Sequence, residues 1–229
     1  MFRYGLAIGR LGRGLLGGLL LALSAAGPVE ARSLTLAGFP AAGLVEGLLL
    51  VARPDLPDPR FSRTVILLLR IDLHGAVGIV INRRTNVAVR EVLKREAGRD
   101  ELPPGRDFGT LHYGGPIALQ ALHVLARGAG AEQVVANVRL VVDDQALQHL
   151  LMQPAAKPGE LLFYAGFAGW SAGQLEGEIR RGDWFLWPAS EEMVFDRPAE
   201  GLWEDLLKDA AGVWTEGPLE PSPALASGP

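Results

Sequence analysis

The chain has 229 residues, of which 48% are hydrophobic and 21% charged, and its formal net charge is −4. This composition is typical of one globular domain with an apolar core, and no basic excess is present to attract a phosphate backbone, so nucleic acid is not an expected partner. The chain has no cysteine, which excludes disulfides, thiolate metal sites and thiol nucleophiles.

The first 31 residues have the pattern of a secretory signal. Three arginines precede a short apolar run at residues 14–27, and Ala31 ends a cleavage site of small and aliphatic residues. The run is shorter than the roughly 20 apolar residues of a membrane span, so we expect no membrane contact in the mature form. Cleavage would remove three arginines and one glutamate, leaving 19 basic and 25 acidic side chains in a periplasmic or exported protein. The alternatives are an uncleaved anchor and a start codon placed too far upstream.

Apolar runs of strand length recur after a linker predicted at residues 32–42. They are near-continuous rather than alternating, which is typical of strands covered on both faces. The five strongest runs lie at 47–52, 64–69, 76–81, 134–142 and 161–165, and two weaker ones at 122–126 and 184–187.

Helical spacing of apolar residues occurs in four segments. Ser171 and Gln174 match a capping box at the start of the third, and Asp196 is a candidate N-cap for the fourth, with Pro198 in its first turn. Asp143 fits the start of the second as a cap. The segments are 87–97, 144–152, 171–181 and 198–210.

Strands outnumber helices in this sequence and do not alternate with them one for one. That order favours an α+β fold with a mixed sheet over a doubly wound βαβ fold. With no internal repeat and no second linker, we expect a single domain at residues 43–212. The end of the chain, 213–229, is rich in proline and small residues and is predicted to be a disordered tail.

The sequence contains no recognisable metal, cofactor or phosphate-binding motif. The four histidines are scattered without ligand spacing, and no G-x₄-G-K-[ST] loop is present, so no metal or cofactor is predicted. Acidic neighbours such as Asp143 and Asp144 fit helix capping, and the basic doublets 83–84 and 180–181 are isolated. We assign no catalysis to the carboxylates.

One motif matches the pattern around the catalytic serine of a hydrolase. Residues 169–173 are a literal G-x-S-x-G between a predicted strand and a predicted helix, the context of a nucleophile elbow. In that hydrolase class the acid and the histidine follow the serine, and no histidine follows Ser171. The serine also fits the N-cap of the next helix. A base from upstream in the chain stays an alternative.

Four blocks of distinctive sequence follow one another along the chain. They are PDLPDPRFSRTV at 54–65, GAVGIVINR at 75–83, GGP at 114–116 and YAGFAGWSAGQLE at 164–176. Phe195, Asp196 and Trp203 come after them. In this order the blocks resemble the bacterial YqgE/AlgH family, and the resemblance extends from about Gly43 to Asp209.

The resemblance implies a compact α+β fold with a sheet bent towards a pseudo-barrel, and no established enzymatic activity or cofactor. One branch of the family is labelled a transcriptional regulator, and members are typically cytoplasmic without a signal. The chain departs from the family pattern at Ser171, usually glycine, and at Phe167, usually tyrosine. The motif residues expected to shape the fold are Asp58, Phe61, Gly75, Gly78, Gly114, Gly115, Pro116, Gly166, Gly169, Gly173 and Glu176.

These motif residues also have physical interpretations. Gly75 and Gly78 would let backbone approach closely at a strand entry, and the glycines at 114–115 with Pro116 are typical of a turn. Asp58 is expected to accept backbone N–H groups in the proline-rich loop that Phe61 anchors.

A candidate binding site combines Asn82, Arg83, Trp170 and Gln174. If the first two end a central strand and the others lie at a neighbouring strand-to-helix turn, the four converge at one rim of the fold. Arg83 would offer a planar donor fork, the amides adaptable hydrogen bonds and Trp170 a stacking face. The alternative is structural: Asn82 caps a turn, Gln174 completes its capping box and Trp170 fills the core.

Three functions follow from these observations. The first is a non-enzymatic domain that binds a protein or a small ligand. The sequence does not identify the ligand, the partner or the oligomeric state. The second is a DNA-associated regulator, which rests on the family label. The third is a serine hydrolase that uses Ser171.

Overall fold

The computed structural model of the protein describes residues 44–97, 102–128, 132–153 and 159–215. The predicted signal at 1–31, the linker at 32–42 and residues 216–229 of the predicted tail lie outside these ranges. The last helix continues to Thr215, beyond the predicted domain boundary at residue 212.

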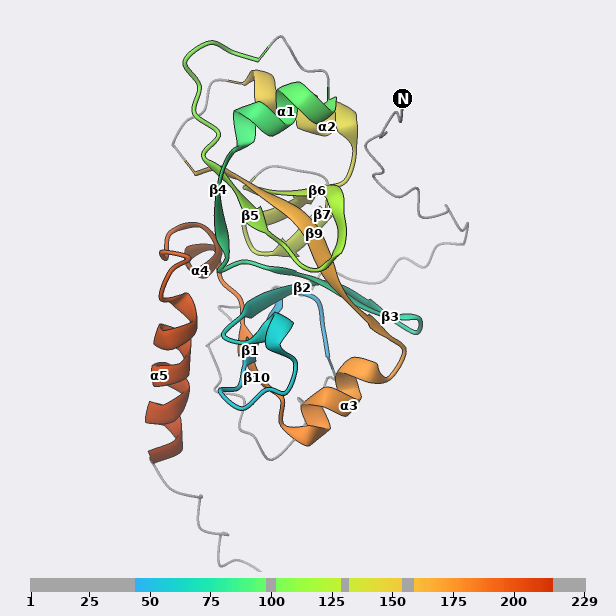
Figure 1. Ribbon diagram of the computed structural model, residues 1–229, viewed down its shortest axis with the longest axis vertical. Helices are drawn as coiled ribbons and strands as arrows, with labels where there is room; N and C mark the ends of the chain where they lie inside the picture. Colours follow the sequence, from blue (N-terminus) through green and yellow to red (C-terminus); the bar gives the residue numbers. More distant parts are fainter. Residues whose placement is uncertain (1–43, 98–101, 129–131, 154–158, 216–229) are drawn as a thin grey trace, which may run out of the picture.

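A ten-stranded, strongly curled sheet is the framework of the described residues (Figure 1). Its path runs β10-β1-β2-β3-β9-β6-β8-β7, with β5 beside β9 and β4 beside β5. The β5–β9 pair is parallel and the other pairs are antiparallel. The strands are β1 Leu48–Ala52, β2 Val65–Asp72, β3 Gly75–Val80, β4 Arg84–Ala88, β5 Thr110–Tyr113, β6 Ile117–Arg127, β7 Glu132–Val135, β8 Val138–Val141, β9 Leu161–Ser171 and β10 Trp184–Pro188.

Helices flank this sheet at both ends. In Figure 1, α1 and α2 lie at one end, while α3 and α5 lie towards the other. The helices are α1 Val89–Ala97, α2 Asp144–Met152, α3 Gln174–Arg181, α4 Glu191–Phe195 and α5 Leu202–Thr215, with a 3-10 turn, η1, at Pro59–Phe61. The predicted α+β fold with a mixed, bent sheet and flanking helices is therefore confirmed.

β9 is the long strand at which the sheet bends. Its end, residues 168–171, pairs with β3, whereas its first part pairs with β5 and β6. Gly166 lies between the two parts with φ +71°, a conformation that glycine adopts without a steric penalty. A single strand thus carries residues from one part of the curled sheet to the other.

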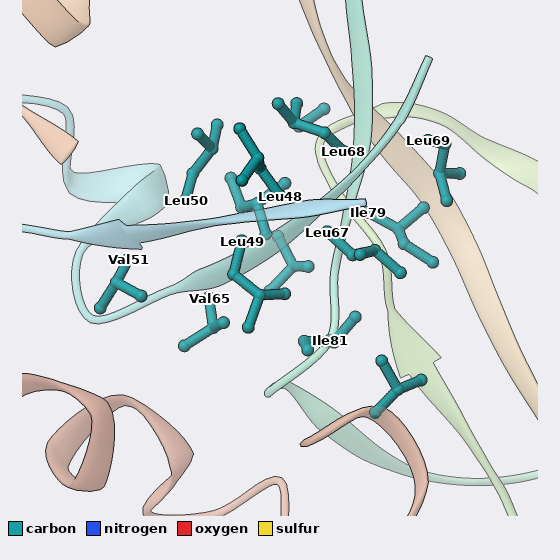
Figure 2. Packing of buried hydrophobic residues seen from close by; sticks show 14 of the residues in the cluster. Leu48, Leu49, Leu50, Val51, Val65, Leu67, Leu68, Leu69, Ile79 and Ile81 are labelled. Carbon is teal, nitrogen blue, oxygen red and sulfur yellow. The ribbon is translucent and has the colours of Figure 1, made fainter. Parts of the chain in front are cut away.

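Two clusters of buried side chains form the core. The larger is centred on β1, β2 and β3, and Figure 2 shows Leu49, Leu67 and Ile79 packed within it. Each of these side chains has no exposed surface, and removing one from water contributes about 1.5–3 kcal/mol. The smaller cluster joins α1 and α2 to β6 and β9 through residues such as Leu93 and Leu151.

Four of the five strongest apolar runs become single strands, as predicted, in β1, β2, β3 and β9. β1 is buried along its whole length, and β2 along its first five residues. The weaker predictions at 122–126 and 184–187 are confirmed within β6 and β10.

One predicted strand is wrong: residues 134–142 form a hairpin of β7 and β8. Asn137 lies between these strands with φ +61°, and its carbonyl accepts the N–H of Gly128. Asparagine tolerates this left-handed conformation better than most residues, so it permits a turn inside an apolar run.

The sequence does not predict β4, β5 or α4. β4 is mostly exposed and polar, and β5 and α4 have only four and five residues. Segments this short carry too little hydrophobic periodicity to be recognised.

Two of the three predicted helix caps are wrong. Gly173, with φ +75°, is the N-cap of α3, and Ser171 still belongs to β9. Asp196 caps the C-terminus of α4, and α5 begins only at Leu202. The Asp143 cap is confirmed, since its side chain accepts the N–H of Ala146 at 2.6 Å.

Gly75 and Gly78 are needed for close approach, as predicted. A Cβ on Gly75 would lie 1.9 Å from the carbonyl oxygen of Trp170, and Gly75 has φ +137°. A Cβ on Gly78 would lie 2.7 Å from the Ile66 side chain and 2.9 Å from the carbonyl oxygen of Leu67. The two glycines therefore let β3 lie close to β9 and β2.

Candidate functional site

A pocket of about 170 Å³ lies between the 56–61 loop, the end of β9, α3 and the start of β10. Trp170 and Gln174, two of the predicted site residues, line it. Pro116 and Gly169 from the family-like blocks line it as well, with Ile117 at the start of β6.

The turn after α3 brings β10 to this pocket. Gly182, with φ +83°, ends the helix, and its N–H donates to the carbonyls of Glu178 and Ile179. Glycine at this position is the usual end of a helix because it adopts the left-handed conformation. The chain then reverses, so that Trp184 begins β10 beside the helix it has just left.

Three aromatic rings form one wall of the pocket. Phe61 stacks on Trp170 with ring centroids 6.3 Å apart, and its ring meets that of Trp184 edge-on at 6.1 Å. The two indole rings lie at 80° to each other, 6.3 Å apart. Trp170 is 6% exposed and Trp184 3% exposed, so the wall belongs largely to the core.

Glu178 connects the two indoles. Its Oε2 accepts the indole N–H of Trp170 at 2.8 Å and that of Trp184 at 2.9 Å. Its Oε1 accepts the side-chain amide of Gln174 at 3.1 Å, one helical turn earlier. Glu178 was not among the predicted site residues, because the sequence does not show that tryptophans from two strands meet one helical carboxylate.

Asp58 orders the loop that carries Phe61. Its side chain accepts the backbone N–H of Arg60 at 2.9 Å, as predicted, and caps η1, in which Pro59 is the first residue. The Arg60 guanidinium also donates to both Asp58 oxygens, and these hydrogen bonds lower the pKa of the Asp58 carboxyl.

Asn82 and Arg83 contact the same loop from the connection between β3 and β4. Asn82 accepts the N–H of Val65 at 2.8 Å and donates to the carbonyl of Arg63 at 2.9 Å. Arg83 donates to the carbonyls of Arg60 at 2.7 Å and Ser62 at 3.0 Å. The structure therefore brings Trp170 and Gln174 together in the pocket wall, and places Asn82 and Arg83 behind the loop that covers it.

The charges around the pocket are unequal. Arg60 pairs with Asp58, and Arg181 pairs with Asp183 at 2.7 Å. The donors to Glu178 are two indoles and one amide, all neutral, so within the described ranges this carboxylate has no cationic partner. The lining thus contains three carboxylates and two guanidinium groups.

Ser171 lies at the end of β9 and is exposed. Its N–H donates to Oε1 of Gln174 at 3.1 Å, which is half of the predicted capping box. The turn of the G-x-S-x-G segment comes after the serine, at Gly173.

The remaining motif residues pack against β9 or lie on α3. A Cβ on Gly114 would lie 2.4 Å from the carbonyl oxygen of Gly166, and one on Gly115 would lie 2.1 Å from the backbone of Phe167. The glycine pair thus allows close approach to β9, which the turn prediction did not include. Glu176 is half-buried on α3.

A second pocket, of about 210 Å³, is lined by Arg84, Arg106, His112 and neighbouring residues. Arg106 donates to the carbonyls of Leu150 at 2.9 Å and Leu151 at 2.7 Å, at the end of α2, where a positive charge is favourable. This arginine thus connects the loop before β5 to a helix terminus.

His112, in the lining of the second pocket, belongs to a row of polar side chains with the half-buried His123 and the buried Tyr164. His112 and His123 are both paired in register with Tyr164, which has no exposed surface. Burial lowers the pKa of both histidines, and the nearby Arg84 charge lowers that of His112 further. Burial also raises the pKa of Tyr164. These groups are therefore neutral at pH 7.

The described part of the chain shows neither a metal-binding cluster nor a membrane-spanning helix. No group of three or more His, Cys, Asp or Glu side chains there could hold a metal ion. None of the helices described is both long and apolar enough to cross a membrane.

The chain is similar in sequence to uncharacterised bacterial proteins. A UPF0301 protein of Chlorobium luteolum is 35% identical over 173 residues, which cover 74% of this chain and 87% of the relative. A UPF0301 protein of Streptomyces coelicolor is 37% identical over 175 residues, covering 72% and 86%.

Solved structures show the same fold. The solution structure of the AlgH protein from Pseudomonas aeruginosa is 30% identical, with a TM-score of 0.57, and the match covers 80% of this chain and 95% of that one. A crystal structure from Corynebacterium diphtheriae, 23% identical, has a TM-score of 0.57 over 78% of this chain and 88% of that one. The sequence profile described as AlgH-like matches residues 49–214. The chain therefore belongs to the AlgH-like (YqgE/AlgH) family.

Proposed function

We propose that this protein is a non-catalytic binding domain and that the pocket beside α3 is its ligand site. The observation that carries the proposal is Glu178, whose carboxylate is held by two indoles and an amide in the wall of a pocket. A hollow with apolar walls and a few convergent polar groups is the usual form of a small-molecule site.

The pocket is held rigid from both sides. Trp170 and Trp184 come from two strands of the sheet and share one carboxylate oxygen, which fixes both rings. Asp58 and Arg83 fix the loop that contributes Phe61. A site whose side chains are already locked loses little conformational freedom when it binds, which favours affinity.

Asn82 and Arg83 take a positioning role in this proposal. Both bond to backbone groups of residues 60–65, so their side chains act on the ligand through the loop. Trp170 and Gln174 act directly, as a wall and as a rim amide.

The two alternatives receive less support. A hydrolase needs Ser171 at a sharp turn next to a base, whereas this serine ends a strand and its N–H donates to Gln174. A DNA-binding regulator needs a basic surface, whereas the pocket lining has one more carboxylate than guanidinium groups.

A fragment screen by NMR tests the proposal on the full chain. Fragments that bind the pocket should shift the indole N–H signals of Trp170 and Trp184. They should leave that of Trp203 in place, because its N–H donates to the buried carbonyl of Ala52. Gln174→Ala should weaken binding, whereas Gln145→Ala, an exposed glutamine on α2, should not. Fragments that shift only signals elsewhere, or an absence of any binding, would contradict the proposal.

A further inference from the structure

We propose that the pocket beside α3 takes a single alkylammonium group, bound by Glu178 against the aromatic wall. This inference rests on the proposed binding function and names the chemical class of the ligand. The choice of an alkylammonium group follows from the charge of the lining, the one free acceptor position of the Glu178 carboxylate and the size of the pocket.

The pocket lining has one more carboxylate than guanidinium groups, so one bound cation would balance its charge. Asp58 and Asp183 each have an arginine within 2.7 Å, so their charges are compensated. Among the residues that the structure describes, Glu178 accepts only neutral donors, and the excess negative charge of the pocket is therefore located on it.

The hydrogen bonds of Glu178 distinguish between kinds of cation. A carboxylate has about four acceptor positions, two on each oxygen. Oε2 is filled by the indoles of Trp170 and Trp184, and Oε1 has accepted Gln174, so one position remains, on Oε1. A guanidinium group binds a carboxylate best through a two-pronged fork that needs a position on each oxygen. An ammonium group is a point charge that needs only one.

The volume of the pocket and its apolar walls determine the size and polarity of the part of the ligand behind the ammonium group. Its volume, about 170 Å³, is below the roughly 300–1,000 Å³ of sites for drug-sized ligands, so it fits a short chain rather than a large molecule. Leu56, Pro57 and Pro116 line it, and Ile117 beside them is 41% exposed. These apolar groups would cover the alkyl stem behind the ammonium.

The same chemistry has two sources: a free amine and a lysine side chain of another protein. The probes are therefore n-butylammonium, its neutral counterpart 1-butanol, n-butylguanidinium and the blocked lysine N-acetyl-lysine methylamide. Binding to the full chain is measured from the indole N–H signals of Trp170 and Trp184. Tighter binding of the blocked lysine than of butylammonium identifies a protein lysine as the source, and the reverse identifies a free amine.

Butylammonium is expected to bind wild-type protein at least tenfold more tightly than 1-butanol or butylguanidinium. Glu178→Gln should abolish this preference, because the amide oxygen can still accept the indoles but carries no charge. Arg181→Gln, which removes a positive charge from the same pocket, should leave butylammonium binding equal or tighter. The comparison of probes on wild-type protein needs no variant, so it decides the matter even if Glu178→Gln does not fold.

Two results would overturn the inference and leave the binding function standing. One is equal binding of butanol or butylguanidinium at the two indoles. The other is a failure of the ammonium probes to bind while other fragments shift the same signals. If no fragment of any kind shifts Trp170 or Trp184, the proposed function fails together with the inference.

Discussion

Trp170 and Trp184 bury their indole rings and direct both N–H groups to one oxygen of Glu178. A buried donor without an acceptor costs about 1–3 kcal/mol, so the carboxylate is needed for the fold as well as for a ligand. Stability and binding can be separated at this residue, because a neutral amide retains the acceptor and loses the charge.

We expect Glu178→Ala to lower the free energy of unfolding by about 2–5 kcal/mol, since it leaves two indole donors unpaired. Glu178→Gln should cost less than about 1.5 kcal/mol, as it keeps one oxygen facing the indoles. Urea denaturation followed by tryptophan fluorescence measures both. Equal losses for the two variants would show that the indoles do not depend on this acceptor.

His112 and His123 make the stability depend on pH. Burial lowers the pKa of each below its ordinary value of 6.5, so the unfolded chain takes up protons at a pH where the folded chain does not. Stability should therefore be full above about pH 7 and fall as the pH drops through 6.5, by about 1.4 kcal/mol for each pH unit separating the two pKa values of a group.

His112→Phe should flatten this dependence, because the ring stays and the titrating group is removed. His74→Gln, at an exposed turn histidine, should leave it unchanged. Urea midpoints at pH 7.5 and 5.5 provide the measurement. If wild type and His112→Phe lose stability equally on acidification, His112 does not contribute.

At the scale of secondary-structure elements, Arg83 holds in place the loop of residues 56–63, which includes the pocket-lining residues 56–61. Arg83 bonds to two carbonyls of this loop, and its guanidinium lies 5.8 Å from the Tyr113 ring centroid. Phe61 depends on this loop for its place against Trp170. Loosening of this loop would therefore open the pocket by moving Phe61 out of its aromatic wall.

Arg83→Ala should lower stability by about 1–2 kcal/mol and increase amide hydrogen exchange at residues 60–63, because two charge-assisted bonds are lost. Arg84→Ala is the control, since its side chain is half exposed and its acidic partner Glu200 lies 4.0 Å away. Unchanged exchange in Arg83→Ala, combined with lost ligand binding, would instead mean that Arg83 touches the ligand itself.

Strands could be predicted from the sequence where apolar residues follow one another without interruption. The run at 64–69 could become only a buried strand, and β2 contains nearly all of it. The helix starts were less predictable, because Gly173 begins α3 through a left-handed conformation while the Ser171 pattern suggested a side-chain cap. The hairpin at Asn137 could not be recognised for a similar reason: one residue with positive φ interrupts an apolar run.

At the scale of the whole molecule, the pocket contains two of the four residues grouped from the sequence, Trp170 and Gln174. Trp170 and Gln174 are close together along the chain, and the strand-to-helix turn between them was recognisable. Trp184 reaches Glu178 through the turn at Gly182, only six residues along the chain, whereas Phe61 comes from a distant loop and meets the two indole rings. The donors to Glu178 all lie within eight residues of it along the chain, but two of them belong to strands on either side of α3, and the sequence does not show that both indoles turn towards the helix.

We expect no sequence-selective binding of duplex DNA at physiological salt. The chain has a net charge of −4, and neutralising phosphates needs clustered Lys and Arg. An anisotropy titration with random and promoter-derived duplexes, at two salt concentrations, measures this. Nanomolar binding of one sequence over the others would support the regulator instead.

The most direct test of the account is a crystal structure of the protein grown with n-butylammonium. The account predicts the ammonium nitrogen within hydrogen-bond distance of Glu178 Oε1, with the alkyl chain along Leu56 and Ile117 and both indole N–H groups still bonded to Oε2. The contradicting result is a pocket in which the Arg181 guanidinium has left Asp183 and occupies the free side of Glu178, with the probe bound elsewhere or not at all.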